Sequence, residues 1–263
     1  MILYEDPAIM WFSLAAAAVL GAVFGSFINC AAWRTAHGES FLTGRSRCAL
    51  CGHLLGPADL VPVISYLALG GRCRYCGEKI SPRYMLTELA MAAAFVLCLL
   101  RFDLSGQALR GMGFAVILLG LSLVDLEIFE IPDGFLIAGI IWWVLTVPLC
   151  AVVGQGIAAQ LKSALPGAFA ISCGMLALSL IFDKVTGKES LGGGDIKLFF
   201  MTGLYLGPAG GLLQLICACL TGLLFSAAVK KERIPFGPAI SLAAFLALIA
   251  GGPVISWYMG LFL

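Results

Sequence analysis

Residues 134–153 read GFLIAGIIWWVLTVPLCAVV, twenty consecutive residues without a charged side chain. About 20 apolar residues suffice for an α-helix to cross the hydrocarbon core of a bilayer. The rest of the chain has the same character, because 61% of its 263 residues are hydrophobic and only 12% are charged. Soluble domains carry about 25% charged residues. The composition therefore predicts an all-α polytopic membrane protein surrounded by lipid bilayer.

Similar apolar segments recur along the chain and predict about eight transmembrane helices. The sixth and seventh segments meet at Gly207-Pro208, and the eighth contains Gly251-Gly252-Pro253, where we expect the helix to kink or end early. The run 11–33 is too long for a secretory signal and follows no basic residue, so we interpret it as a retained first helix. The eight segments are 9–33, 85–101, 108–126, 134–153, 163–182, 196–207, 209–229 and 235–262.

The distribution of lysine and arginine predicts the orientation of these helices. If the loop 34–84 is cytoplasmic and the helices alternate, 13 of the 16 basic residues fall on the cytoplasmic side and three fall outside. Such a bias follows the positive-inside rule. We therefore expect a multi-pass membrane protein, divided into a first helix (1–33), a cytoplasmic insert (34–84) and a helical membrane core (85–263). With a net charge of +1, it lacks the basic surface of a nucleic-acid-binding protein.

Four cysteines in the insert form two CxxCG motifs. Twenty-one residues separate Cys51 of the first motif, Cys48-Ala49-Leu50-Cys51-Gly52, from Cys73 of the second, Cys73-Arg74-Tyr75-Cys76-Gly77. This spacing predicts a tetrahedral four-thiolate zinc site, since structural disulfides are rare in the cytoplasm. Zinc would also supply folding energy to an insert with few apolar side chains. A redox-active dithiol pair is the alternative.

Two aspartates lie at predicted helix ends. Asp125 is at the inner end of the third predicted helix, and Asp195 is at the inner start of the sixth, directly after Gly192-Gly193-Gly194. The topology places both carboxylates at the same membrane depth on the cytoplasmic side. Carboxylates in membrane segments are costly and often functional, and the glycines permit close backbone approach and positive φ. Two carboxylates that share a proton are able to activate water, as in aspartic proteases.

Other interpretations of these residues stay open. One alternative is that Asp195 only caps a helix, and an aspartate near the interface, such as Asp125, costs less than one at the bilayer centre. A transporter would use the pair as ion sites, although such sites usually lie near the midplane. A non-catalytic assembly factor would use the zinc insert for docking. The only two histidines lie in the insert, so no Ser–His–Asp arrangement competes.

Taken together, the motifs resemble those of type IV prepilin peptidases, membrane aspartic proteases of the GxGD class. The likeness spans most of the chain and implies that Asp125 and Asp195 are the catalytic aspartates and that the four cysteines are the cytoplasmic tetracysteine motif. The matching stretches are Gly25-Ser26-Phe27-Ile28-Asn29 with Arg34; Cys48 to Glu88, including Asp59-Leu60-Val61-Pro62, Ser65-Tyr66 and Ile80-Ser81-Pro82-Arg83-Tyr84; Asp125 with Ile131-Pro132-Asp133; and Glu189 with Gly192-Gly193-Gly194-Asp195 and Lys197.

The resemblance also implies an activity. Such enzymes lie in the bacterial cytoplasmic (inner) membrane, and at its cytoplasmic face they remove the short basic leader of prepilins and pseudopilins of type IV pili and type II secretion systems. Many then methylate the new N-terminal residue with S-adenosylmethionine, although we find no methyl-donor motif in this chain. Besides the two aspartates, we expect Gly192, Gly193, Gly194, Glu189, Lys197 and Asp133 to form the active-site loop or to position substrate.

Overall fold

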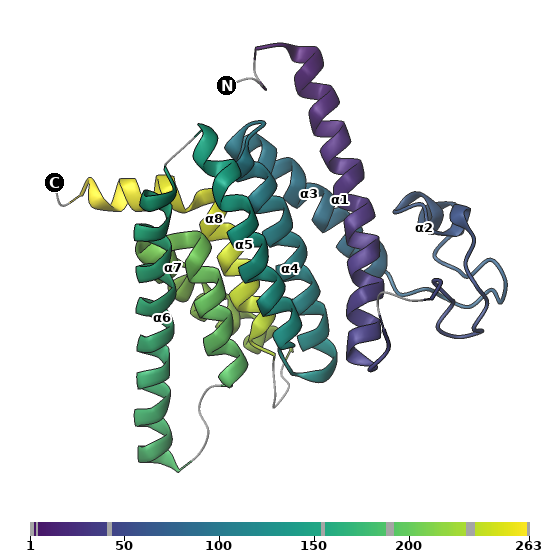
Figure 1. Cartoon of the computed structure of the whole chain (residues 1–263). Coiled ribbons are helices and arrows are strands. Elements are labelled where there is room, and N and C mark those ends of the chain that lie inside the picture. Colours follow the sequence, from purple (N-terminus) through teal and green to yellow (C-terminus); the bar gives the residue numbers. More distant parts are fainter. Residues whose placement is uncertain are drawn as a thin grey trace. The chain divides into compact units, whose positions relative to one another are not determined.

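The computed structural model describes residues 3, 5–40, 44–153, 156–187, 192–229 and 235–261. Helices dominate these ranges, and two isolated β-bridges are their only extended pairing. Seven of the described helices are long and apolar enough to cross a membrane. The predicted all-α class is therefore confirmed. The label α7 (Figure 1) covers both predicted segments 196–207 and 209–229, which the non-helical residue Gly207 separates, so the eight predicted apolar segments correspond to these seven helices.

The chain divides into two compact units, which we describe separately. The first unit, Met1–Leu104, contains α1 (Pro7–Ala36), the short 3-10 helix η2 (Pro57–Asp59), α2 (Ile64–Ala68) and α3 (Arg83–Phe102).

Glycines bring α1 and α3 of the first unit into close contact. A Cβ atom on Gly25 would lie 2.8 Å from the Cα atom of Glu88, and one on Gly21 would lie 2.6 Å from the carbonyl oxygen of Met91. Small residues are enriched at helix contacts in membranes because they let backbones approach in this way. One turn beyond Gly25, the buried Asn29 amide donates to the Thr87 hydroxyl of α3.

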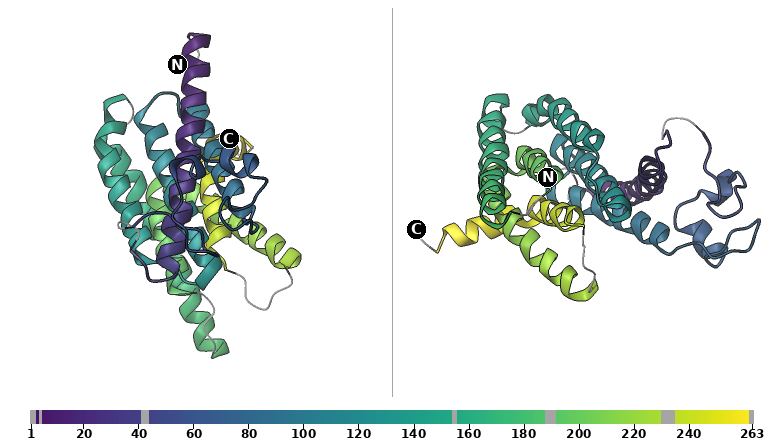
Figure 2. Two further views of the ribbon diagram at one scale, coloured as in Figure 1. Left: turned by 90° about the vertical axis from the view of Figure 1, so that its right-hand side faces the viewer. Right: turned by 90° about the horizontal axis from the view of Figure 1, so that it is seen from below.

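The second unit, Ser105–Leu263, is a bundle of α4 (Gly106–Ile128), α5 (Asp133–Val153), α6 (Ile157–Thr186), α7 (Gly193–Val229) and α8 (Gly237–Met259). Figure 2 shows α7 between α6 and α8, and α7 makes extensive contacts with both. The buried core of this unit is formed by side chains of α4, α5, α7 and α8, namely Phe114, Leu118, Leu121, Leu136, Leu198, Phe199, Met201, Ala218, Ile240, Ala243 and Ala244.

Helix α7 folds back on itself at the predicted break. Gly207 has φ 67° and ψ −177°, which is not helical, and Pro208 follows it. The Thr202 hydroxyl donates to the Gln214 side chain at 2.9 Å, although twelve residues of straight helix would span about 18 Å. The two arms of α7 therefore pack against each other on either side of Gly207. Glycine is needed there, because a Cβ atom would lie 2.5 Å from Ser163 Oγ.

The sequence left open whether Pro253 ends the last helix. In the structure α8 continues through Pro253 to Met259, and its final turns point away from the rest of the bundle (Figure 1). Proline removes one helical hydrogen bond and clashes with the preceding turn. Such a proline often bends a helix without ending it.

Candidate functional site

The last turn of α4 holds Asp125 in the protein interior. Leu121, Leu123 and Val124 are buried directly before it, and Asp125 itself is only 4% exposed. The helix ends three residues later. Phe129 adopts a left-handed conformation there, and its N–H donates to the Asp125 carbonyl at 2.9 Å. Burial of the neighbouring apolar residues therefore places the carboxylate predicted at this helix end in the protein interior.

The first turn of α8 supplies the hydrogen-bond donor for this carboxylate. The backbone N–H of Gly237 donates to Asp125 Oδ2 at 2.9 Å. Free N–H groups at a helix N-terminus stabilise negative charge. A side chain has no room at this position, because a Cβ atom on Gly237 would lie 2.5 Å from Asp125 Oδ2.

Gly237 was not among the site residues predicted from the sequence. The available signal was a glycine before Pro238 at the start of an apolar segment, and this pattern is common at helix starts. Nothing in the sequence indicated that the helix start faces Asp125, which lies 112 residues earlier.

Asp195 lies in the first turn of α7, directly after the three glycines. Of the two properties that glycine permits, positive φ is not used at Gly192, Gly193 or Gly194. Gly193 and Gly194 already belong to the helix, whose geometry requires negative φ. Gly194 instead permits close approach, since a Cβ atom there would lie 3.0 Å from Ile131 Cβ. Gly193 has nothing within 4 Å and faces open space.

The ends of α4, α5, α7 and α8 meet at one end of the bundle. Lys197 of α7 forms an ion pair of 2.7 Å with Asp133, the first residue of α5. Both side chains are exposed, at 59% and 62%, so the pair adds little stability but marks where the two helices meet. The structure thus brings together Asp133, Lys197 and Gly194, whereas Glu189 lies outside the described residues.

Asp125 and Asp195 lie at the same end of the bundle, since Gly194, the residue before Asp195, packs against Ile131, six residues after Asp125. Asp125 is buried and Asp195 is half-buried. Among the described residues, no lysine or arginine forms an ion pair with either carboxylate. Keeping two nearby acids in the interior without a cation is unfavourable, and such arrangements are typical of functional sites.

The first unit contains a second candidate site, formed by the four cysteines of the insert. The Sγ atoms of Cys48, Cys51, Cys73 and Cys76 all lie within 4.8 Å of one another. Four sulfurs around a zinc ion at 2.3 Å would be about 3.8 Å apart, so this cluster fits the predicted metal with little adjustment.

Two similar backbone turns build the cysteine cluster. In the first turn, Gly52 has φ 72° and its N–H donates to the carbonyl of Cys48. In the second turn, Gly77 has φ 73° and its N–H donates to the carbonyl of Cys73. The turn directs the N–H groups of Cys76 and Tyr75 at the Cys73 sulfur, which lowers the pKa of Cys73 to about 7. Thiolate is the form that binds metal, so the turn geometry favours metal binding.

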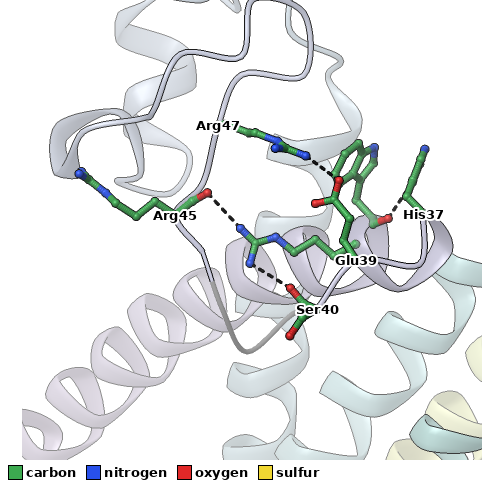
Figure 3. Close-up of polar contacts among 7 residues, drawn as sticks. His37, Glu39, Ser40, Arg45 and Arg47 are labelled. Carbon is green, nitrogen blue, oxygen red and sulfur yellow. Dashed lines mark hydrogen bonds and ion pairs between the residues drawn. The ribbon is translucent and has the colours of Figure 1, made fainter.

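Polar contacts attach the insert to the end of α1. Figure 3 shows Arg47 paired with Glu39. The carbonyls of Ser40 and Arg45 accept hydrogen bonds from the guanidinium of Arg34, which is 8% exposed. The buried guanidinium therefore links Ser40, which follows α1, to Arg45 of the insert.

The fold and the sites define a multi-pass helical membrane protein with two carboxylates at one end of its bundle and a tetracysteine insert. The model of the bacterial peptidase A24 N-terminal domain matches residues 19–102, and that of the type IV leader peptidase family matches residues 112–227. The chain belongs to the type IV leader peptidase family, which confirms its resemblance to type IV prepilin peptidases.

Relatives from several bacteria match almost the whole chain. A prepilin leader peptidase/N-methyltransferase of Bacillus subtilis is 31% identical and covers 92% of this chain and 96% of its own length. A type 4 prepilin-like proteins leader peptide-processing enzyme of Escherichia coli is 33% identical, with 88% and 92% covered. A prepilin leader peptidase/N-methyltransferase of Pseudomonas aeruginosa is also 33% identical, with 81% and 74% covered. No solved structure matches the chain.

Proposed function

We propose that this protein is an aspartic endopeptidase that removes the basic leader of prepilins or pseudopilins. The observation that carries the proposal is the buried Asp125, held by the Gly237 N–H, with Asp195 at the same end of the bundle. The names of the relatives, which describe prepilin processing, supply the substrate class.

In the proposed reaction the two carboxylates share one proton. The ionised carboxylate removes a proton from water, whose oxygen attacks the scissile carbonyl, and the protonated carboxyl group donates its proton to the leaving amine. The N–H of Gly237 fixes the orientation of Asp125 throughout. Gly192 and Gly193, which are exposed, offer backbone against which an extended substrate segment is able to lie.

Leader removal by the purified protein in detergent tests this function. A transporter that uses the same aspartates needs two compartments and would show no proteolysis, and an assembly factor would show none either. Ion sites of transporters also lie near the bilayer midplane, whereas the ion pair between Lys197 and Asp133 marks a bundle end beside Asp195.

We further propose that the aspartates and the insert face the cytoplasm. Alkaline phosphatase, which is active only outside the cytoplasm, should be inactive when fused after Glu130, beside the site, and active when fused after Gly156, at the opposite end of α5. Alkaline phosphatase activity in whole cells shows on which side of the membrane each fusion point lies. The reverse pattern would place the site outside the cytoplasm and contradict the proposed orientation.

We also propose that the protein uses two groups that are not part of the polypeptide, a zinc ion and S-adenosylmethionine. Zinc would occupy the tetracysteine cluster and stabilise the insert. S-adenosylmethionine would supply a methyl group for the new N-terminus, in line with the names of the relatives.

Replacing Cys48 with serine should remove bound metal. Purified wild-type protein should contain about one zinc ion per chain, and Cys48→Ser should contain almost none, since a serine hydroxyl is a poor zinc ligand. Inductively coupled plasma mass spectrometry measures the content, and Cys219→Ser, which changes an exposed cysteine of α7, is the control. Wild-type protein without zinc, with thiols that cycle between oxidised and reduced forms, would favour the redox alternative.

A further inference from the structure

The short helix α2 of the insert turns an apolar face away from the protein. Ile64 is 65% exposed and Leu67 is 64% exposed, and side chains three residues apart are neighbours on one face of a helix. The other face is half-buried within the insert at Ser65 and Tyr66. The Tyr66 hydroxyl donates to the Ile80 carbonyl at 3.4 Å on that side. Two large apolar side chains of α2 are therefore left for a partner outside the chain.

A hydrogen bond to α3 fixes the level of α2 along the membrane helices. The Val63 N–H, directly before α2, donates to Glu88 Oε2 at 2.7 Å. Glu88 in turn packs against α1, since a Cβ atom on Gly25 would lie 2.8 Å from its Cα atom. Helix α1 continues from Gly25 to Ala36, which corresponds to about 16 Å. Figure 1 likewise shows α2 level with the middle of α1 and not past the C-terminal end of that helix.

The membrane helices expose apolar side chains at this same level. Phe24 and Phe27 of α1 and Leu86 and Leu89 of α3 are all exposed, and they flank the close contact between the two helices. Both helices are long and apolar enough to cross a membrane, so these side chains face lipid. An isolated exposed leucine on a water-facing surface is ordinary. The apolar face of α2 is different, because it lies at a level where the neighbouring helices face lipid.

Positive charge lies next to α2. Arg72 and Lys79 are exposed and pair through an isolated β-bridge, and they line one hollow together with Tyr66 of α2. Within the described ranges, neither forms an ion pair. The whole insert, 34–84, has seven basic and three acidic residues. Anionic headgroups attract basic residues near a membrane surface by about 1 kcal/mol each, so the charge of the insert complements such a surface.

Protein partners match this surface less well. The basic leader of a prepilin would meet like charges on the insert, and so would the insert of a second copy of this chain. Such juxtaposition disfavours binding. A bilayer surface with anionic headgroups matches both the apolar face of α2 and the basic residues beside it.

We propose that α2 is a membrane-surface helix, with Ile64 and Leu67 inserted among the acyl chains of the adjacent leaflet. Helices with an apolar face bind at the boundary between headgroups and acyl chains in this way, and basic residues strengthen the binding. The insert is then held at the bilayer by α2 in addition to α1 and α3. The inference concerns the first unit alone and does not depend on the proposed peptidase activity.

Photolabelling of the full-length protein in vesicles of phosphatidylcholine and phosphatidylglycerol tests the proposal. The phospholipids carry a diazirine on one acyl chain, and mass spectrometry of the digested protein locates the label. Wild-type protein should be labelled on residues 61–67 as well as on α1 and α3. Ile64→Asn combined with Leu67→Asn should lose most of the label on 61–67, because an amide is unfavourable among acyl chains.

The control is Leu50→Asn, which makes the same change at an exposed leucine of the first CxxCG motif and should leave the label on 61–67 unchanged. The midpoint of thermal unfolding in detergent should be the same in the double variant and the wild type, which shows that the variant is folded.

Two results would overturn the proposal. The first is absence of label from 61–67 in wild-type protein whose Phe27 segment is labelled, and the second is equal label in the wild type and the double variant. Cross-links from 61–67 to a second copy or to added prepilin, without lipid label, would show that a protein occupies this face instead.

Discussion

Replacing either Asp125 or Asp195 with asparagine should abolish leader cleavage. Asparagine keeps the shape of the side chain, and in Asp125→Asn its oxygen is still able to accept the Gly237 N–H. It is unable to hold or release the shared proton, and proton transfer of this kind contributes roughly 10²–10⁴-fold to a rate. Cleavage of a purified prepilin, followed by gel mobility in detergent, should fall at least a hundredfold in each variant.

The same variants should insert and fold normally, since each change is isosteric. Glu130→Gln, an exposed acid five residues beyond Asp125, is the matched control and should cleave at the wild-type rate. If Asp195→Asn retained substantial activity, the aspartic mechanism would be wrong, even though the family assignment would stand. The double variant should be no worse than either single one, because residues that act as a unit are not additive.

Replacing Gly237 with alanine should be nearly as damaging, although glycine carries no chemistry of its own. The new Cβ atom would lie 2.5 Å from Asp125 Oδ2, and the carboxylate is the part that is able to move. A displacement of about 1 Å in an active site can cost about a hundredfold in rate. We expect a loss of that size in kcat with little change in KM, because the contact affects the reacting group and not the substrate.

The control for this variant is Gly134→Ala, in the first turn of α5 at the same end of the bundle. An added Cβ atom there meets nothing within 4 Å, so activity should be retained. A shifted pH profile of the remaining activity of Gly237→Ala would support a role in positioning Asp125. Wild-type kinetics in Gly237→Ala would show that the carboxylate is not held by α8 during the reaction.

The helices of this protein could be predicted well from the sequence because each depends on local composition. Long apolar segments must form helices in a bilayer, where every backbone group needs an internal partner. The break at Gly207-Pro208 could also be predicted, because a proline interrupts a helix whatever surrounds it. The packing of the two arms of α7 against each other, seen in the hydrogen bond between Thr202 and Gln214, could not be predicted because it joins residues on either side of the break.

Motifs with short spacing could be predicted from the sequence equally well. The two CxxCG turns carry their geometry within five residues each, and the structure gathers their sulfurs within 4.8 Å. The three glycines before Asp195 were harder to interpret. Glycine permits both positive φ and close packing, and only the neighbouring Ile131 shows that Gly194 serves the second purpose.

The sequence by itself determined the membrane fold, the cysteine cluster and the two aspartates as candidates, since these follow from composition and local spacing. The tertiary structure decided what surrounds each acid. Asp125 meets the N-terminus of α8, and Glu88 of α3 accepts a hydrogen bond from the Val63 N–H. Both contacts join residues distant in the chain, 112 and 25 positions apart. They exist only because buried side chains and glycines fix how the helices pack, and no local pattern encodes that packing.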